Sequence, residues 1–167
     1  KRQNDTVLKT PTPPEGRLFV FDDAKKTLVG EITAVKGVVG PGPIAWAGGN
    51  RVIGWTNDPI NAQKSILYGV DVEKGKVAWT VPLPFKFPIV IGSNQKESWD
   101  FRLGPDGWIW TFMGKDAKTL VRIDPQTATI KGVAQVSRGG RIAFSRRDVY
   151  LSGTTFLRRI RGVVEGK

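Results

Sequence analysis

The amino-acid sequence predicts an all-β protein built from short antiparallel strands joined by tight turns. The clearest evidence is the stretch from Asp100 to Val136, which reads as four short strands connected by three turns. The first of these turns is Gly104-Pro105-Asp106-Gly107. Pro fixes φ, Asp bonds to nearby backbone amides and Gly adopts positive φ, so all three residue types favour turns. Short strands with turns at this spacing are typical of a sandwich, a barrel or a propeller.

Two sequence patterns recur along the chain and favour the propeller among these architectures. The first pattern, an apolar strand, a polar turn and a second apolar strand, occurs at Ile44–Thr56, Asp100–Phe112 and Arg141–Gly153. The second pattern, a strand ending in Asp, a turn and a strand, occurs at Arg17–Ile32, Ile66–Val81 and Thr119–Ala134. Its aspartates are 49 and 53 residues apart, at Asp22, Asp71 and Asp124. Repeats of this length with four strands each indicate propeller blades, which must stack on neighbouring blades to bury both faces.

The repeats divide the chain into a tail and successive blades. Residues 1–16 are polar and proline-containing, so we expect a tail or linker there. Residues 17–167 form the blades, predicted as an outer half-blade, two full blades and a partial blade at residues 17–36, 42–82, 98–137 and 139–167. Because propellers typically have four to eight blades, these three and a half or so blades indicate part of a larger ring. The rest would be a missing segment or a second chain. A smaller, self-contained β-sandwich is the alternative.

Each strand is predicted from its own residues and its flanking turns. The first hairpin comprises Leu18–Phe21 and Leu28–Thr33, and Ile44–Trp46 and Val52–Thr56 flank a glycine-containing turn. A long polar loop, Thr56–Ser65, precedes the next two strands of that blade. Three prolines argue against a regular strand in the first half of residues 82–98. Residues 141–161 predict three strands of a last blade.

Charge and residue usage restrict the chemistry of the chain. The formal net charge is +11, and residues 138–167 contain eight basic but only two acidic residues. This balance favours a polyanionic partner, although a solvated basic surface is the alternative. The chain has no cysteine and no histidine, so it cannot by itself complete a Cys-ligated metal site or a Ser-His-Asp triad. No metal site is predicted from its own residues, and no membrane-spanning segment or zinc-dependent nucleic-acid motif is visible.

A ligand-binding face is predicted from the way the strands of a blade are connected. In a propeller, the loops between blades and those joining second to third strands lie on one face, where ligands meet the central channel. An arginine there could clamp a carboxylate, and a tryptophan could stack on a sugar. The strongest candidates are Trp99, Arg138 and Arg141, which flank the innermost strands, together with Asn57 and Lys96. The same loops also contain Asp58, Asn61, Lys64, Lys86, Asn94, Glu97, Lys115, Asp116 and Lys118.

The three repeated aspartates, by contrast, are predicted to be structural. Asp22, Asp71 and Asp124 occupy equivalent turns of three different blades. An Asp in this position can bond backbone amides of its own hairpin. We therefore do not expect them to form a carboxylate cluster.

The segments "LGPDGWIWTF" and "LVRIDPQTATI" resemble blades of streptogramin-lyase-like and NHL-type propellers, and "LYGVDVEKGKVAWTVPLP" is similar to quinoprotein-type blades. This resemblance covers most of Arg17–Arg161 and concerns structural turns. Streptogramin lyases use a histidine base and a magnesium ion, for which this chain has no matching position. Any catalytic base, and any divalent metal, would then belong to another part of the ring. No cofactor site of quinoproteins has a match either.

Two functions remain open from the sequence. The first is the later blades of a secreted lyase- or hydrolase-type enzyme that acts on an acidic carbohydrate or similar anionic ligand, with catalytic residues unknown. Such an enzyme would favour an extracellular location, which the composition itself leaves undecided. The second is a non-catalytic propeller scaffold that binds a protein or a polyanion. The lyase-like turns together with the basic last blade favour the first function narrowly.

Overall fold

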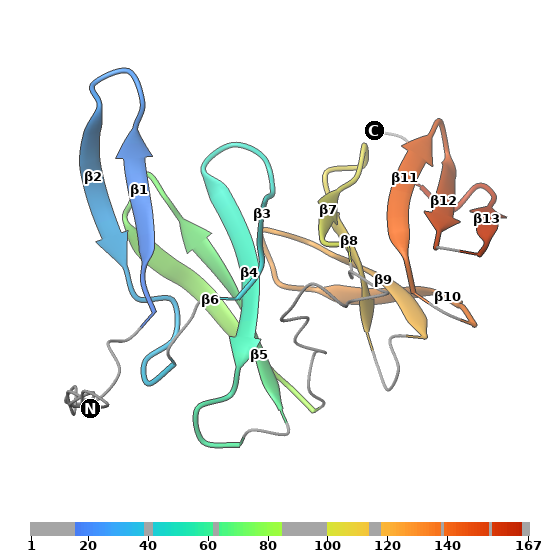
Figure 1. Cartoon of the computed structure of the whole chain (residues 1–167), viewed down its shortest axis with the longest axis horizontal. Coiled ribbons are helices and arrows are strands. Elements are labelled where there is room, and N and C mark those ends of the chain that lie inside the picture. Colours follow the sequence, from blue (N-terminus) through green and yellow to red (C-terminus); the bar gives the residue numbers. More distant parts are fainter. Residues whose placement is uncertain are drawn as a thin grey trace, which may run out of the picture.

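The chain forms only β-strands, turns and loops in the residues that the structure describes. The structure is a computed structural model that describes residues 16–38, 42–61, 64–84, 100–113, 118–137, 139–153 and 155–164. Within them thirteen strands form four antiparallel sheets, shown in Figure 1. The strands are β1 (Leu18–Asp22), β2 (Thr27–Ile32), β3 (Ile44–Trp46), β4 (Arg51–Asn57), β5 (Ser65–Asp71), β6 (Lys76–Leu83), β7 (Arg102–Leu103), β8 (Ile109–Met113), β9 (Thr119–Ile123), β10 (Ile130–Gln135), β11 (Arg141–Ser145), β12 (Asp148–Ser152) and β13 (Leu157–Ile160).

Each sheet is a meander in which strands that follow one another in the chain lie side by side. The first sheet is β1-β2, the second β3-β4-β5-β6, the third β7-β8-β9-β10 and the fourth β11-β12-β13. The prediction of an all-β fold with antiparallel strands is therefore confirmed. The meander order follows from the short turns, because antiparallel neighbouring strands need only a few connecting residues.

The structural prediction for the repeated aspartates is also confirmed. Asp22 Oδ1 accepts a hydrogen bond from the Lys25 amide, and Asp71 Oδ1 accepts one from the Lys74 amide, at 3.1 and 3.0 Å. Asp124 Oδ1 accepts hydrogen bonds from two amides of its turn, those of residues 126 and 127, at 2.7 and 3.3 Å. Each carboxylate thus holds its own hairpin, and the three do not form a carboxylate cluster.

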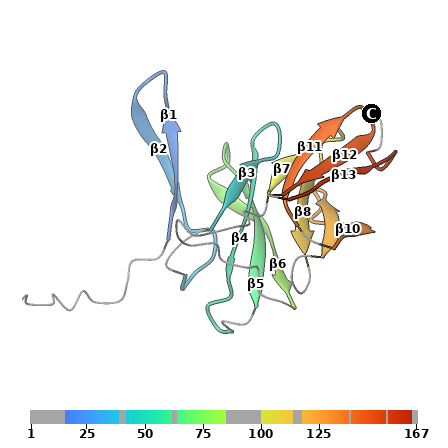
Figure 2. The ribbon, with the colours of Figure 1, turned by 45° about the vertical axis from the view of Figure 1, so that its right-hand side comes forward.

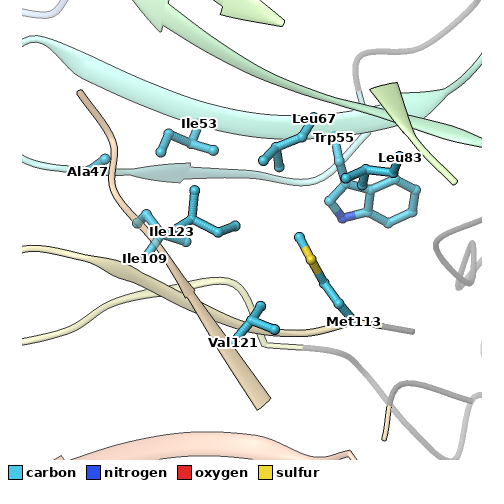
Figure 3. Packing of buried hydrophobic residues seen from close by; sticks show 9 residues of the cluster. All are labelled: Ala47, Ile53, Trp55, Leu67, Leu83, Ile109, Met113, Val121 and Ile123. Carbon is cyan, nitrogen blue, oxygen red and sulfur yellow. The ribbon is translucent and has the colours of Figure 1, made fainter. Parts of the chain in front are cut away.

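The sheets stack face to face in chain order, and three apolar clusters lie between them. Leu18 and Val20 of the first sheet pack against Tyr68 and Val70 of the second. Between the second and third sheets, Figure 3 shows side chains of β4 and β5 facing those of β8 and β9, and this cluster comprises Ala47, Ile53, Trp55, Leu67, Leu83, Ile109, Met113, Val121 and Ile123. A third cluster joins the third sheet to the fourth and includes Trp110, Phe112, Leu120, Val149 and Leu151. The middle sheets are therefore buried on both faces.

The first strand of the third sheet is short, since β7 contains only Arg102 and Leu103 within the described residues. Asp100 precedes this strand, and it connects the third sheet to the fourth. Its Oδ2 accepts a hydrogen bond from the Ile142 amide of β11 at 2.6 Å and lies 3.4 Å from Arg102 Nη2.

No helix in the described part of the chain is long and apolar enough to cross a membrane.

Candidate functional site

The residues predicted as ligand contacts are only partly within the described structure. Trp99, Lys96 and Arg138 lie outside the described residues. Asn57 ends β4, is partly buried, and its Oδ1 has no hydrogen-bond partner among the described residues. Arg141 begins β11 in the fourth sheet and is exposed. The two described candidates thus belong to different sheets and form no common site. Lys86, Asn94, Glu97, Lys115 and Asp116 also lie outside the described residues.

The loop after β4 is partly explained by its own hydrogen bonds. Asp58 Oδ1 accepts hydrogen bonds from the Ile60 and Asn61 amides at 2.8 and 3.2 Å. Asp58 therefore stabilises the loop in the same way as the repeated aspartates stabilise their turns.

A cleft of about 550 Å³ lies at the opposite end of the sheets, where the hairpin turns of the second and third sheets meet. Its walls are the β3–β4 turn, the β7–β8 turn and the β9–β10 turn, at residues 46–50, 103–108 and 124–126. The prediction from loop connections pointed to the other end of the strands. The cleft forms here because the stacked sheets place these turns next to one another.

The wall of the cleft from the third sheet is organised around the carboxylate of Asp106. Its Oδ1 accepts hydrogen bonds from the Trp108 amide at 3.2 Å and from Trp110 Nε1 at 3.0 Å. Its Oδ2 lies 3.4 Å from Arg122 Nη1, and both side chains are buried. A Cβ on Gly104 would come within 2.6 Å of this carboxylate, so the turn needs glycine at that position. The Gly-Pro-Asp-Gly turn and the Arg-Ile-Asp strand are thus parts of one hydrogen-bonded unit.

Trp108 extends this unit towards the outer edge of the third sheet. The Arg122 guanidinium lies over the indole, 4.7 Å from the ring centroid, and Lys131 Nζ lies 5.2 Å from it. Both distances are within the range of cation–π attraction. The ring is therefore held in place by two cations of its own sheet.

The second sheet contributes an exposed indole to the cleft, and Arg51 directly follows the lining residues 46–50. Trp46 is 61% exposed, and its Nε1 donates to the Gly49 carbonyl at 2.9 Å. Arg51 Nη2 lies 3.4 Å from Gln126 Oε1 across the two sheets, whereas its Nε and Nη1 are buried without a hydrogen-bond partner among the described residues. Asn50 Nδ2 bonds the Asp71 and Glu73 carboxylates at 3.2 and 2.8 Å.

The carboxylates of the cleft hold its walls in place. Asp106 accepts a hydrogen bond from Trp110 Nε1 and pairs with Arg122, and Asp124 Oδ1 accepts hydrogen bonds from amides of its own turn. No group of three or more His, Cys, Asp or Glu residues that could hold a metal ion is present in the described ranges.

A second feature lies in the fourth sheet, at the end that carries the β11–β12 turn. It consists of Arg146, Arg147, Arg159 and Arg161, and we call it the arginine-rich turn end. All four residues are exposed. Figure 1 shows both the β11–β12 turn and the β3–β4 turn at the upper edge of the molecule. The described part of residues 139–164 contains one acidic residue, Asp148. Positive charge at the turn end therefore exceeds negative charge by three.

Asp148 holds one of these arginines, Arg159, in place. Its Oδ1 accepts a hydrogen bond from the Gly162 amide at 2.8 Å, and its Oδ2 forms an ion pair with Arg159. The Gly162 amide, then Arg159 and Arg161, hold the pKa of Asp148 below its ordinary value. Arg159 in turn lies 5.8 Å from the centroid of the Tyr150 ring.

The sequence analysis identified neither of these two features, and only the arginine-rich turn end had a signal in the sequence. The basic excess of the last blade was noted, but its concentration at one turn was not. The pairs Arg146-Arg147 and Arg158-Arg159, separated by strand β12, are the signal that could have placed it. The cleft had no local signal, because it forms from three turns that lie up to 80 residues apart, at 46 and 126.

No family model matches the chain, and no curated protein matches it.

Proposed function

We propose that this chain is part of a β-propeller that binds an acidic carbohydrate through the arginine-rich turn end of its fourth sheet. The single observation that carries this proposal is that four exposed arginines, Arg146, Arg147, Arg159 and Arg161, lie at one end of the fourth sheet, where Asp148 is the one acidic residue among the described residues. The rest of the ring would be a further segment or a second chain. The ligand belongs to the class of uronic-acid polymers, which carry a carboxylate on each acidic sugar.

The propeller part of the proposal is supported by the repeated meanders. The two complete sheets have four antiparallel strands each, and consecutive sheets stack face to face with apolar clusters between them. Blades of a propeller have this strand order and this mode of packing. The resemblance of the third sheet to lyase-like blades rests on the Asp106–Arg122 unit, which is a structural feature.

The preference for an oxyanion ligand follows from the chemistry of arginine. A guanidinium presents two parallel N–H donors that match two oxygens of a carboxylate or a phosphate, and it stays charged at every working pH. Lysine offers a point charge without this geometry. The comparison of a carboxylated polymer with DNA in the test below therefore decides between these two classes of oxyanion.

The enzymatic form of the proposal adds one requirement to the same surface. A lyase or hydrolase acting on the acidic carbohydrate would need a base, and any divalent metal, from a part of the ring other than the described residues. The arginines would then neutralise the substrate carboxylate, whose negative charge opposes abstraction of the neighbouring proton. The non-catalytic form needs only the binding step.

The test is binding of polygalacturonate, with neutral dextran and double-stranded DNA as comparison ligands. The parent chain should bind polygalacturonate, and binding should weaken steeply with salt, because the contacts are charge pairs at an exposed surface. The variant Arg146→Ala/Arg147→Ala should lose at least about tenfold in affinity, since two guanidinium contacts are removed. Dextran should not bind.

A matched control is available in the first hairpin. The variant Lys25→Ala/Lys26→Ala removes the same number of positive charges from the β1–β2 turn, where both residues are exposed. It should retain most of the affinity. Equal losses in both variants would contradict a localised site, and DNA binding with equal strength would replace the carbohydrate by a general polyanion.

A further inference from the structure

The outward face of the first sheet is apolar although it is exposed. Phe19, Phe21 and Leu28 are 63%, 57% and 56% exposed. Leu18 and Val20, which alternate with the two phenylalanines on β1, point to the opposite face and pack against the second sheet. Figure 2 shows the β1–β2 hairpin at one end of the row of sheets.

The same positions are buried in the next sheets of the chain. Phe21 and Phe19 lie one and three residues before Asp22, as Val70 and Tyr68 do before Asp71. Tyr68 and Val70 are buried against the preceding sheet, which is the first.

The third sheet follows the same rule. Ile123 and Val121 lie one and three residues before Asp124, and they pack against the second sheet, which precedes their own. These positions of the repeat thus face the preceding sheet wherever a preceding sheet is described. In the first sheet they carry aromatic side chains and face solvent.

One hydrogen-bonding edge of β1 also has no partner strand within the described residues. β5 pairs with β4 on one side and β6 on the other, and β9 pairs with β8 and β10. β1 occupies the equivalent position in its hairpin but pairs with β2 alone within the described residues. An unpaired strand edge beside an exposed apolar face is a common site of β-sheet association.

We propose that the Phe19–Phe21–Leu28 face and the free edge of β1 are the docking surface for a further antiparallel sheet of the same repeat type. Two inner strands pair with β1 to complete a four-stranded sheet, as β3 and β4 do for β5. A preceding sheet then covers the two phenylalanines, as the first sheet covers Tyr68 and Val70. The proposal rests on the propeller arrangement proposed above but not on the carbohydrate ligand.

The test is a fused chain that supplies both missing parts from the protein's own repeats. Residues 42–84 are followed by a Gly-Ser linker, by residues 42–64, and then by residue 16 onward. Ser65 and Gly16 both lie six residues before their aspartates, so joining residue 64 to residue 16 keeps the strand register. The readout is hydrogen exchange of the amides of residues 18–22, in the parent and in the fused chain.

The expected result is slower amide exchange in β1 of the fused chain, by at least about tenfold. The variant Phe19→Ser/Phe21→Ser should lower the midpoint temperature of unfolding of the fused chain by several degrees. In the parent it should change that midpoint by no more than about 2 °C, because the two rings are exposed there. Unchanged exchange in a folded fused chain would overturn the proposal.

A second measurement keeps the proposal testable if the fused chain does not fold. In the parent chain, Val70→Ala should clearly lower the midpoint temperature of unfolding, because Val70 is buried. Phe19→Ser/Phe21→Ser should not lower it, because both rings are exposed. Equal losses would show that the phenylalanine face is already used within the chain and would overturn the proposal. A dimer in sedimentation experiments that is abolished by Phe19→Ser/Phe21→Ser would also overturn it, since the occupant would be a second copy. Polygalacturonate binding by this variant should match the parent, which separates this inference from the proposed function.

Discussion

Arg122 Nη1 lies 3.4 Å from Asp106 Oδ2, and the two side chains are only 7% and 3% exposed. This pair joins the β7–β8 turn to β9 and also anchors Trp110 through Asp106. Removing one partner of a buried ion pair leaves the other charge uncompensated, at a cost of about 3–5 kcal/mol. Asp106→Ala should therefore lower the free energy of unfolding by about that amount, measured by urea denaturation.

The exposed pair Arg17–Glu31 provides the control for this prediction. Its side chains are 49% and 41% exposed, so Glu31→Gln should change stability by no more than about 0.5 kcal/mol. A similar small loss for Asp106→Ala would show that the buried pair is not a principal support of the third sheet.

Gly69 should not tolerate a side chain. A Cβ at this position would overlap the Trp79 indole, whose Nε1 donates to the Pro125 carbonyl of the third sheet at 3.1 Å. Gly69→Ala should displace the indole and cost about 1–3 kcal/mol, as overpacking usually does. Gly132 is the matched control because a Cβ there has no neighbour within 4 Å. Gly132→Ala should be neutral or slightly stabilising, and equal effects of the two substitutions in thermal unfolding would refute the explanation.

The three repeated hairpins share a left-handed residue four positions after the aspartate. These residues are Lys26, Gly75 and Ala128, with φ values of 54°, 60° and 62°. A non-glycine residue in this region costs roughly 1–2 kcal/mol, which the greater unfolded-state entropy of glycine partly offsets. Ala128→Gly should therefore raise the urea midpoint, and Gly75→Ala should lower it. Effects of the same sign would contradict this prediction.

The ion pair and the amide hydrogen bond of Asp148 should make stability depend on acid pH. The folded-state pKa is lower than the ordinary value of 3.8, chiefly because of the Gly162 amide and Arg159. The stabilisation is therefore fully present above that ordinary value and is lost as pH falls through the folded-state pKa. Asp148→Asn should be less stable than the parent at neutral pH, and the difference should disappear near about pH 2. A difference that is constant with pH would show that the charge is unimportant.

Strands and turns were the part of the fold that could be predicted from residues alone. The hairpin around Asp71 illustrates this, because an apolar strand, an aspartate and a glycine turn are all local features. Contacts between sheets could not be predicted in this way. Asp100 accepts a hydrogen bond from the amide of Ile142, 42 residues away, and no local pattern contains that contact.

The candidate site depended far more on contacts that are distant in sequence. Asn57 and Arg141 were chosen from loop connections, and the structure places them in different sheets. Trp99, Lys96 and Arg138 lie outside the described residues, so their roles stay predictions. The cleft and the turn-end arginines were found only in the structure.

By itself the sequence determined that this chain folds into repeated antiparallel hairpins, because strand alternation and turn chemistry act over a few residues. It also determined the excess of positive charge in the last repeat. Only the tertiary structure decided which faces are buried and which turns meet. Arg51 reaches Gln126 across 75 residues, and Phe19 is exposed while the equivalent Tyr68 is buried. The reason is that sheet stacking brings together side chains from separate repeats, and local sequence patterns do not specify those contacts.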